Sequence, residues 1–153
     1  MQVLIAIDNS EYSKEAIDSI LNRPWSTNAK FLVITVIEPV YPEYVSFHAN
    51  YGHLSQEVFQ EISKSANALV AETVNRFKQS LPNNEIKGQV LEGFAKEEIL
   101  QSAKECNADL IILGSHGRKG INKFLLGSVS EAVASHSPCS VEIVKTKKAN
   151  LAI

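Results

Sequence analysis

Short apolar runs alternate along the chain with segments whose apolar residues recur at helical spacing. The runs lie at residues 2–7, 31–37, 86–92, 109–113 and 140–144. The first two are almost wholly apolar, which is typical of strands buried on both faces of a parallel sheet. Residues 86–92 alternate in polarity, which is typical of an edge strand.

The segments between these runs predict helices. Ser10 is a suitable N-cap for the first helix, and the longest helix is predicted over residues 56–81. The apolar stripe of that longest helix comprises Val58, Ile62, Ala66, Leu69, Val70, Thr73, Val74 and Phe77. Shorter helices are predicted after Gly93 and from Val129 to about His136. The core-facing residues of the first and third helices are predicted to be Ala16, Ile17, Ile20, Leu21, Ile99, Leu100 and Ala103. Alternating strands and helices predict an α/β fold with a parallel sheet.

Residues 40–55 interrupt this alternation with an irregular, tyrosine-rich stretch. Such a length is unusual in a compact domain and predicts a functional or mobile loop. His48 and His53 lie within it. They are interpreted as exposed loop residues, because no third ligand with a recognisable spacing completes a metal site.

The composition is that of an ordinary globular protein of 153 residues, which suits one domain. A net charge of −2 gives no electrostatic reason to expect nucleic acid or a membrane as a partner. The apolar runs are too short for a transmembrane helix, and no signal peptide is visible, so a cytoplasmic location is expected. Cys106 and Cys139 are interpreted as packing residues.

Residues 109–131 carry the strongest chemical signal. An apolar run ends at Gly114, a loop containing Gly117 follows, and Gly127-Ser128 precedes a helix. Glycines allow a close approach of backbone to a ligand, and the N–H groups of a helix N-terminus attract anions. The spacing Gly-x2-Gly-x9-Gly-Ser matches neither the P-loop nor the dinucleotide fingerprint. It predicts a phosphate site of another kind.

A simpler interpretation of the same residues needs no ligand. Gly114 ends a strand, and Ser128 with Glu131 fits a capping box at the start of a helix. Glu131 also opposes the phosphate interpretation, because a carboxylate in the first turn repels an anion unless it points away.

Four places in the chain match one known pattern. They are the opening Val-x-Ile-Ala-Ile-Asp that ends at Asp8, Val36, the helix entry Gly93-Phe94-Ala95, and the loop at residues 114–130. Together they resemble the ATP-binding branch of the universal stress protein family. The resemblance implies a Rossmann-like, single-domain fold with a five-stranded parallel sheet in the order 3-2-1-4-5 and helices on both faces. It implies a nucleotide-binding domain at residues 1–146 and a tail at residues 147–153.

The resemblance also implies a nucleotide site at the carboxyl ends of strands one, two and four. Its residues would be Ala6, Ile7, Asp8, Val36, Leu113, Gly114, His116, Gly117, Arg118, Gly127, Ser128, Val129 and Ser130. The first two residues and Val36 would line adenine, and Asp8 would accept from ribose hydroxyls. The residues from Leu113 to Gly117 would border ribose and phosphates. Those from Gly127 to Ser130 would donate backbone N–H groups and hydroxyls to the phosphates.

Some of these roles have alternatives. Asp8 also suits a turn that leads into a helix. His116 also suits a loop imidazole bonded to backbone. Arg118 and Lys119 either neutralise phosphate or are simply solvated.

The function implied is a stress-response or signalling protein that binds ATP or AMP, with Mg²⁺ or Mn²⁺ held through the phosphates. The alternative is a slow ATPase or self-phosphorylating enzyme that uses the same site. A phosphoacceptor receiver domain fits poorly, because strand one provides Asp8 followed by Asn9 where paired acids are needed. A homodimer through residues Ser140 to Val144 is expected, since an apolar edge strand invites another strand. A tail that covers this edge and leaves a monomer is the alternative.

Overall fold

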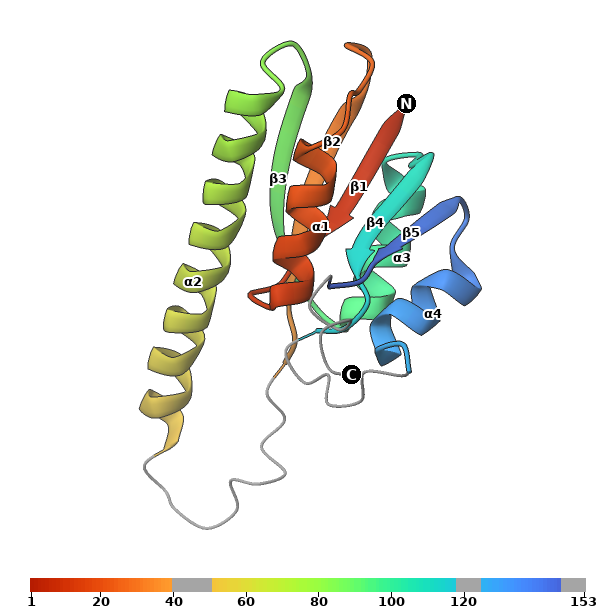
Figure 1. Ribbon diagram of the computed structural model, residues 1–153. Coiled ribbons are helices and arrows are strands. Elements are labelled where there is room, and N and C mark those ends of the chain that lie inside the picture. Colours follow the sequence, from red (N-terminus) through yellow and green to blue (C-terminus); the bar gives the residue numbers. More distant parts are fainter. Residues whose placement is uncertain (40–50, 118–124, 147–153) are drawn as a thin grey trace, which may run out of the picture.

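The computed structural model describes residues 1–39, 51–117 and 125–146, with the backbone alone for residues 51–55. Its elements are β1 (Gln2–Ala6), α1 (Glu11–Leu21), β2 (Lys30–Ile37), α2 (Tyr51–Ser80), β3 (Glu85–Glu92), α3 (Ala95–Glu105), β4 (Leu110–Gly114), α4 (Ser128–His136) and β5 (Ser140–Val144). The strands form one parallel sheet in the order β3-β2-β1-β4-β5, with helices on both faces (Figure 1). The fold predicted from the sequence is therefore confirmed.

Strand β1 occupies the centre of the sheet because it is apolar on both faces. Leu4 pairs with Leu32 of β2 on one side and with Ile111 of β4 on the other. The chain leaves β1 through α1 toward β2, and β4 joins on the opposite side. The carboxyl ends of β1 and β4 therefore lie side by side where the strand order reverses, as Ala6 paired with Leu113 shows.

The hydrophobic core consists of two clusters, one on each face of the sheet. Alternate residues of β1 enter different clusters, as the pleat requires. Val3 and Ile5 pack with residues of α1 and α2, whereas Leu4 packs with Ile99 of α3 and Val133 of α4. The two pairs of helices thus cover opposite faces.

Helix α1 begins as its sequence predicts. The Ser10 side chain caps it, and the Ser13 N–H donates to Oγ of Ser10 over 3.2 Å. Ala16, Ile17 and Ile20 are buried, which fixes the helix on the sheet.

Helix α2 departs from the prediction at its start. It begins at Tyr51, so residues 51–55, predicted to be irregular, are helical. Propagation of a helix needs no apolar stripe, because each added residue gains a hydrogen bond. The predicted stripe is buried at Val70 and Phe77, but Val58 is 47% exposed. The reason is length: 30 helical residues span about 45 Å, whereas an eight-residue strand spans about 26 Å.

The first turns of α2 consequently extend past the sheet (Figure 1). His48, in the rest of the predicted loop, and the side chain of His53 lie outside the described residues.

Candidate functional site

A cavity of about 410 Å³ opens at the carboxyl ends of β1, β2 and β4, between the first turns of α3 and α4. Its volume is within the range of small-molecule sites. The residues that line it include twelve of those predicted from the sequence: Ala6, Ile7, Asp8, Val36, Leu113, Gly114, His116, Gly117, Gly127, Ser128, Val129 and Ser130. Arg118, the remaining predicted residue, lies outside the described residues, as does Lys119. The fold thus brings together residues that are up to 124 positions apart in the chain, Ala6 and Ser130.

Six residues that were not predicted from the sequence also line the cavity: Ser13, Ile34, Thr35, Glu38, Ala95 and Ile99. Ile34 and Thr35 directly precede Val36 at the end of β2, so their position in that strand could have identified them as lining residues. Ala95 belongs to the helix entry already noted. Glu38 follows the same strand, but its relation to Ala95 depends on tertiary structure.

Asp8 serves the turn that the sequence allowed and also faces the cavity. Its N–H donates to Oγ of Ser13 over 2.8 Å, and its Oδ1 accepts from the N–H of Ser10 over 3.0 Å. The other carboxylate oxygen lies against the glycine loop, since a Cβ added at Gly117 would be 2.9 Å from it. One oxygen therefore holds the turn while the second borders the cavity.

Two glycines of the motif permit close packing of the backbone. A Cβ at Gly114 would lie 2.7 Å from the backbone carbon of Tyr12, so the first turn of α1 packs directly on the end of β4. A Cβ at Gly127 would lie 3.2 Å from Cα of His116, and the Gly127 N–H donates to the Ser115 carbonyl over 2.9 Å. The backbone at Gly127 has φ −64°, so close approach is what this glycine provides, not a positive φ.

Helix α4 begins at the cavity without a capping box. Its N-cap is Gly127, and Ser128 is already the first helical residue. The Ser128–Glu131 interpretation is therefore wrong by one position, because the Glu131 N–H bonds to the Gly127 carbonyl over 2.9 Å. Glu131 is exposed and lies outside the set of described residues that line the cavity. The expected conflict between its carboxylate and an anion is thereby reduced.

The hydroxyl of Ser130 has a different role from the one predicted. It is 3% exposed and donates to the Gly114 carbonyl over 2.8 Å, which fastens α4 to the end of β4. A hydroxyl has one hydrogen to donate. Its backbone N–H belongs to the first turn of the helix, where N–H groups have no partner within the helix.

Helix α3 also begins at the cavity, but a carboxylate meets it there. Its first residue, Ala95, donates its N–H to Oε1 of Glu38 over 3.1 Å. The turn before the helix is held by the Gly93 N–H, which donates to the Ile37 carbonyl over 3.0 Å. Glu97 and Glu98 add two more acids to the first turn. Of these three carboxylates, only that of Glu38 belongs to a described residue that lines the cavity.

His116 lies on the cavity wall and is 9% exposed. Its Nδ1 is 3.1 Å from Oγ of Ser115, and its ring is 4.8 Å from that of Tyr12. The imidazole is thus held by contacts that include a side-chain hydroxyl and an aromatic ring. It is positioned to contact a ligand near the glycine loop.

Part of the cavity lining is apolar. Ala6, Ile34, Val36, Ile99 and Leu113 supply its aliphatic surface. Thr35 turns its hydroxyl inward, where it donates to the Ile7 carbonyl over 2.7 Å and ties β1 to β2. The cavity therefore suits a ligand with one flat apolar part and one anionic part.

The described residues were also considered for a metal site, a membrane span and reactive cysteines. Within residues 1–39, 51–117 and 125–146, no three His, Cys, Asp or Glu side chains form a group that could hold a metal ion. The described helices include none with the length and apolar character of a membrane span. Cys106 and Cys139 are free and half-buried against the α3–α4 half of the core, and burial raises the pKa of the Cys106 thiol.

Comparison with known proteins gives a consistent result. A model of the universal stress protein family matches residues 1–145. A curated relative from Staphylococcus aureus (strain USA300), described as a universal stress protein, is 28% identical over 152 residues, which cover 95% of this chain and 84% of the relative. The solved structure of protein MJ0577 superposes with a TM-score of 0.82 at 23% identity and covers 97% of each chain. A universal stress protein solved in complex with cAMP gives a TM-score of 0.65 at 27% identity, over 95% of this chain and 97% of that one.

Proposed function

Because the chain belongs to the universal stress protein family, we propose that its cavity binds an adenine nucleotide, ATP or AMP, and that the protein acts in a stress response or in signalling. The adenine and ribose would lie on the apolar part of the lining, with ribose hydroxyls toward Asp8. The phosphates would lie at the first turn of α4. Binding itself, rather than efficient turnover, would be the activity.

One observation carries the proposal: the first turn of α4 faces the cavity behind a glycine N-cap. Gly127 has no side-chain oxygen to offer to the N–H groups of Ser128, Val129 and Ser130. Those N–H groups and the helix dipole favour an anion. The aliphatic residues that also line the cavity favour a base, so the lining as a whole suits a nucleotide.

The relative solved with cAMP supports an adenine-containing ligand, since it shares 27% identity with nearly the whole chain. A metal that accompanies a triphosphate, Mg²⁺ or Mn²⁺, would be held through the phosphate oxygens.

The test is to denature the purified protein and to identify any released nucleotide by mass spectrometry. Calorimetric titration of nucleotide-free protein then compares ATP, AMP, cAMP and GTP. We expect adenine nucleotides to bind and GTP to bind at least about tenfold more weakly, a difference of about 1.4 kcal/mol. Absence of binding by all four would overturn the proposal. Release of phosphate from ATP over many turnovers would favour the ATPase alternative.

We also propose that two copies pair through the free edge of β5. The Ser115 N–H donates to the Val144 carbonyl over 2.8 Å, so the backbone groups of Val144 point toward β4. Backbone groups alternate in direction along a strand, and those of Val141 and Ile143 therefore point outward. A second β5 in antiparallel orientation would satisfy them.

Val141→Pro tests this edge with little damage to the fold. Proline removes an outward N–H and leaves the bonds to β4 in place. We expect the variant to be a monomer by light scattering and to keep a wild-type circular dichroism spectrum. A wild-type protein with the mass of one chain would favour the alternative in which the tail covers the edge.

A further inference from the structure

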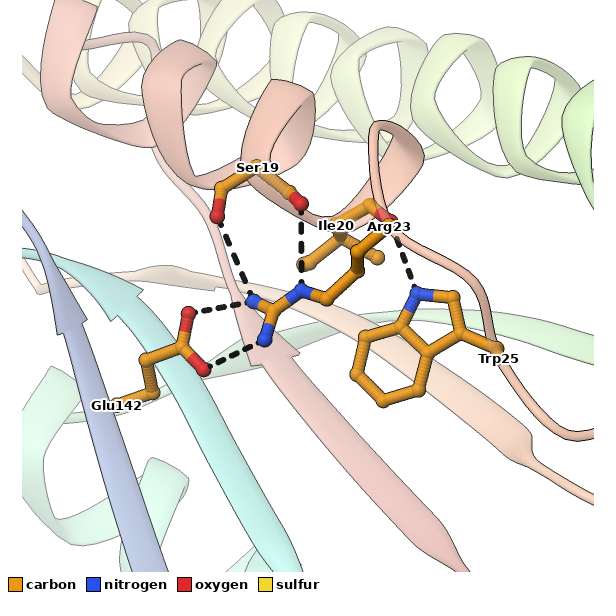
Figure 2. A network of polar contacts seen from close by, with 5 residues as sticks. All are labelled: Ser19, Ile20, Arg23, Trp25 and Glu142. Carbon is orange, nitrogen blue, oxygen red and sulfur yellow. Dashed lines mark hydrogen bonds and ion pairs between the residues drawn. The ribbon is translucent and has the colours of Figure 1, made fainter.

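An ion pair joins the end of α1 to the middle of β5 (Figure 2). The guanidinium of Arg23 donates to both carboxylate oxygens of Glu142, with Nη1 2.9 Å from Oε2. Arg23 also donates through Nε to the Ser19 carbonyl over 3.2 Å and lies 5.0 Å from the centre of the Trp25 ring. The Trp25 indole is itself fixed, since it donates to the Ile20 carbonyl over 2.8 Å. The guanidinium is thus held in one place by three neighbours.

Symmetric pairing of β5 places Glu142 against its own copy. Among registers that pair residues within β5, the one that pairs Val141 with Ile143 of the second copy, and the reverse, forms the most hydrogen bonds, four. That register puts Glu142 on the two-fold axis. Its own backbone points toward β4, so the two copies of Glu142 form a non-hydrogen-bonded pair, in which Cα atoms are about 4.5 Å apart and side chains are closest.

Two carboxylates in that position repel each other. Like charges directly opposite destabilise a pair of strands. Both would lie on the α1 face of the sheet, because Glu142 reaches Arg23 there. The side chains of Arg23 and Glu142 are 32% and 33% exposed, so solvent screens the charge only in part.

We propose that Arg23 is the residue that permits β5 to pair with a second copy of this chain, because it neutralises Glu142 at the two-fold axis. The inference rests on the β5 dimer proposed above. It assigns to the Arg23–Glu142 pair a role in association that is separate from its contribution to the fold. The partner is a second copy in antiparallel orientation, and the interface contains two Arg–Glu pairs side by side.

The test measures the dimer dissociation constant by sedimentation equilibrium in low salt. Arg23→Ala leaves two unpaired carboxylates at the axis and is expected to raise the dissociation constant roughly tenfold. Glu142→Gln removes the repulsion and is expected to leave the constant unchanged or lower. The double variant Arg23→Ala/Glu142→Gln should return to within about threefold of wild type.

Salt separates repulsion from a loss of packing. At ~1 M salt the screening length is about 3 Å, so the Arg23→Ala defect should shrink toward the wild-type value. Arg23→Lys keeps a positive charge without the bidentate geometry and should give an intermediate constant. Circular dichroism of each variant establishes that it is folded.

The outcomes divide clearly. If Val141→Pro breaks the dimer but Arg23→Ala leaves its constant unchanged, the role of Arg23 is wrong and the interface stands. If Arg23→Ala weakens the dimer but neither salt nor Glu142→Gln restores it, Arg23 acts through packing and the proposal is overturned. A monomeric wild type, or a dimer that Val141→Pro does not affect, overturns both the interface and the inference.

Discussion

Helices α3 and α4 both begin at the same cavity, yet their first turns differ in charge. At α3 the carboxylate of Glu38, which lines the cavity, accepts the N–H of Ala95. At α4 the N-cap is Gly127, and Glu131 is exposed. The two helix dipoles have the same direction relative to their own axes. The residues around each end therefore decide which one is available to an anion.

The two sides of the cavity therefore differ in how well they accommodate an anion. This difference favours an anion at α4 over α3 and so supports the proposed position of the phosphates at α4. The lesson is that a helix N-terminus at a cavity is not by itself an anion site. Its capping residue, here a glycine or a distant glutamate, determines whether N–H groups remain for a ligand.

The largest loss of ATP affinity is expected when a carboxylate is introduced at the start of α4, as one is present at the start of α3. Gly127→Asp places a carboxylate at the N-cap, where it can accept the N–H groups and repel phosphate. We expect ATP affinity to fall by at least about 100-fold, or about 2.7 kcal/mol. Calorimetric titration measures the affinity, and circular dichroism should show a fold close to wild type.

Gly127→Asn is the matched control for this change. It has nearly the same volume without the charge, so it separates steric contact with His116 and Ser115 from repulsion. An ATP affinity that Gly127→Asp leaves unchanged would refute the assignment of phosphate to α4.

A smaller loss of affinity is expected from a change at Asp8, whose carboxylate lies beside Gly117. Asp8→Ala should weaken ATP, AMP and adenosine alike, each by about tenfold, because the carboxylate faces the nucleoside rather than the phosphate tail. Asp8→Asn retains an oxygen that can accept from the Ser10 N–H and serves as the control for the turn. Loss of ATP with adenosine and AMP affinity retained would instead make Asp8 a phosphate or metal residue.

The smallest change is expected at the start of α3, and it concerns the free energy of unfolding. Glu38→Ala removes the acceptor of the Ala95 N–H and should lower the free energy of unfolding by about 1 kcal/mol, as loss of a helix cap does. Glu38→Gln should restore most of that loss, since its amide oxygen can still accept. Chemical denaturation provides the measurement.

The same two variants sharpen the comparison between the helix starts. Both remove one negative charge from the cavity, so ATP should bind up to about threefold more tightly in each, and neutral adenosine should change less. If Glu38→Ala instead weakened ATP by tenfold or more, Glu38 would contact the ligand directly rather than repel its phosphates.

Much of the candidate site was predictable because it consists of strand ends. A buried parallel strand is an apolar run, and the residue that follows it lies at the same edge as the residues that follow its neighbours. Asp8, Val36 and Gly114 could therefore be placed in one region from sequence spacing and the family resemblance. Glu38 and Ala95 could not, because their hydrogen bond joins residues 57 positions apart and depends on how α3 packs against the sheet.

Local sequence patterns gave wrong predictions where a polar group had more than one possible hydrogen-bond partner. The Ser128–Glu131 spacing fits a capping box, but the helix begins one residue earlier because Gly127 packs against the backbone of Ser115 and His116. Ser130 looks like a phosphate ligand in the sequence, yet its hydroxyl is taken by the Gly114 carbonyl. Such competition is decided by tertiary distances.

The sequence by itself determined the strands, most helix positions and most of the core residues, and the family resemblance added the edge of the sheet where a ligand would bind. Hydrophobic periodicity and turn residues are local, so they can be interpreted without coordinates. The tertiary structure alone decided which helix N-terminus is left for an anion, how far α2 extends beyond the sheet, and that Arg23 meets Glu142 across 119 positions. Each of these depends on distances between segments remote in the chain, which hydrophobic pattern does not encode.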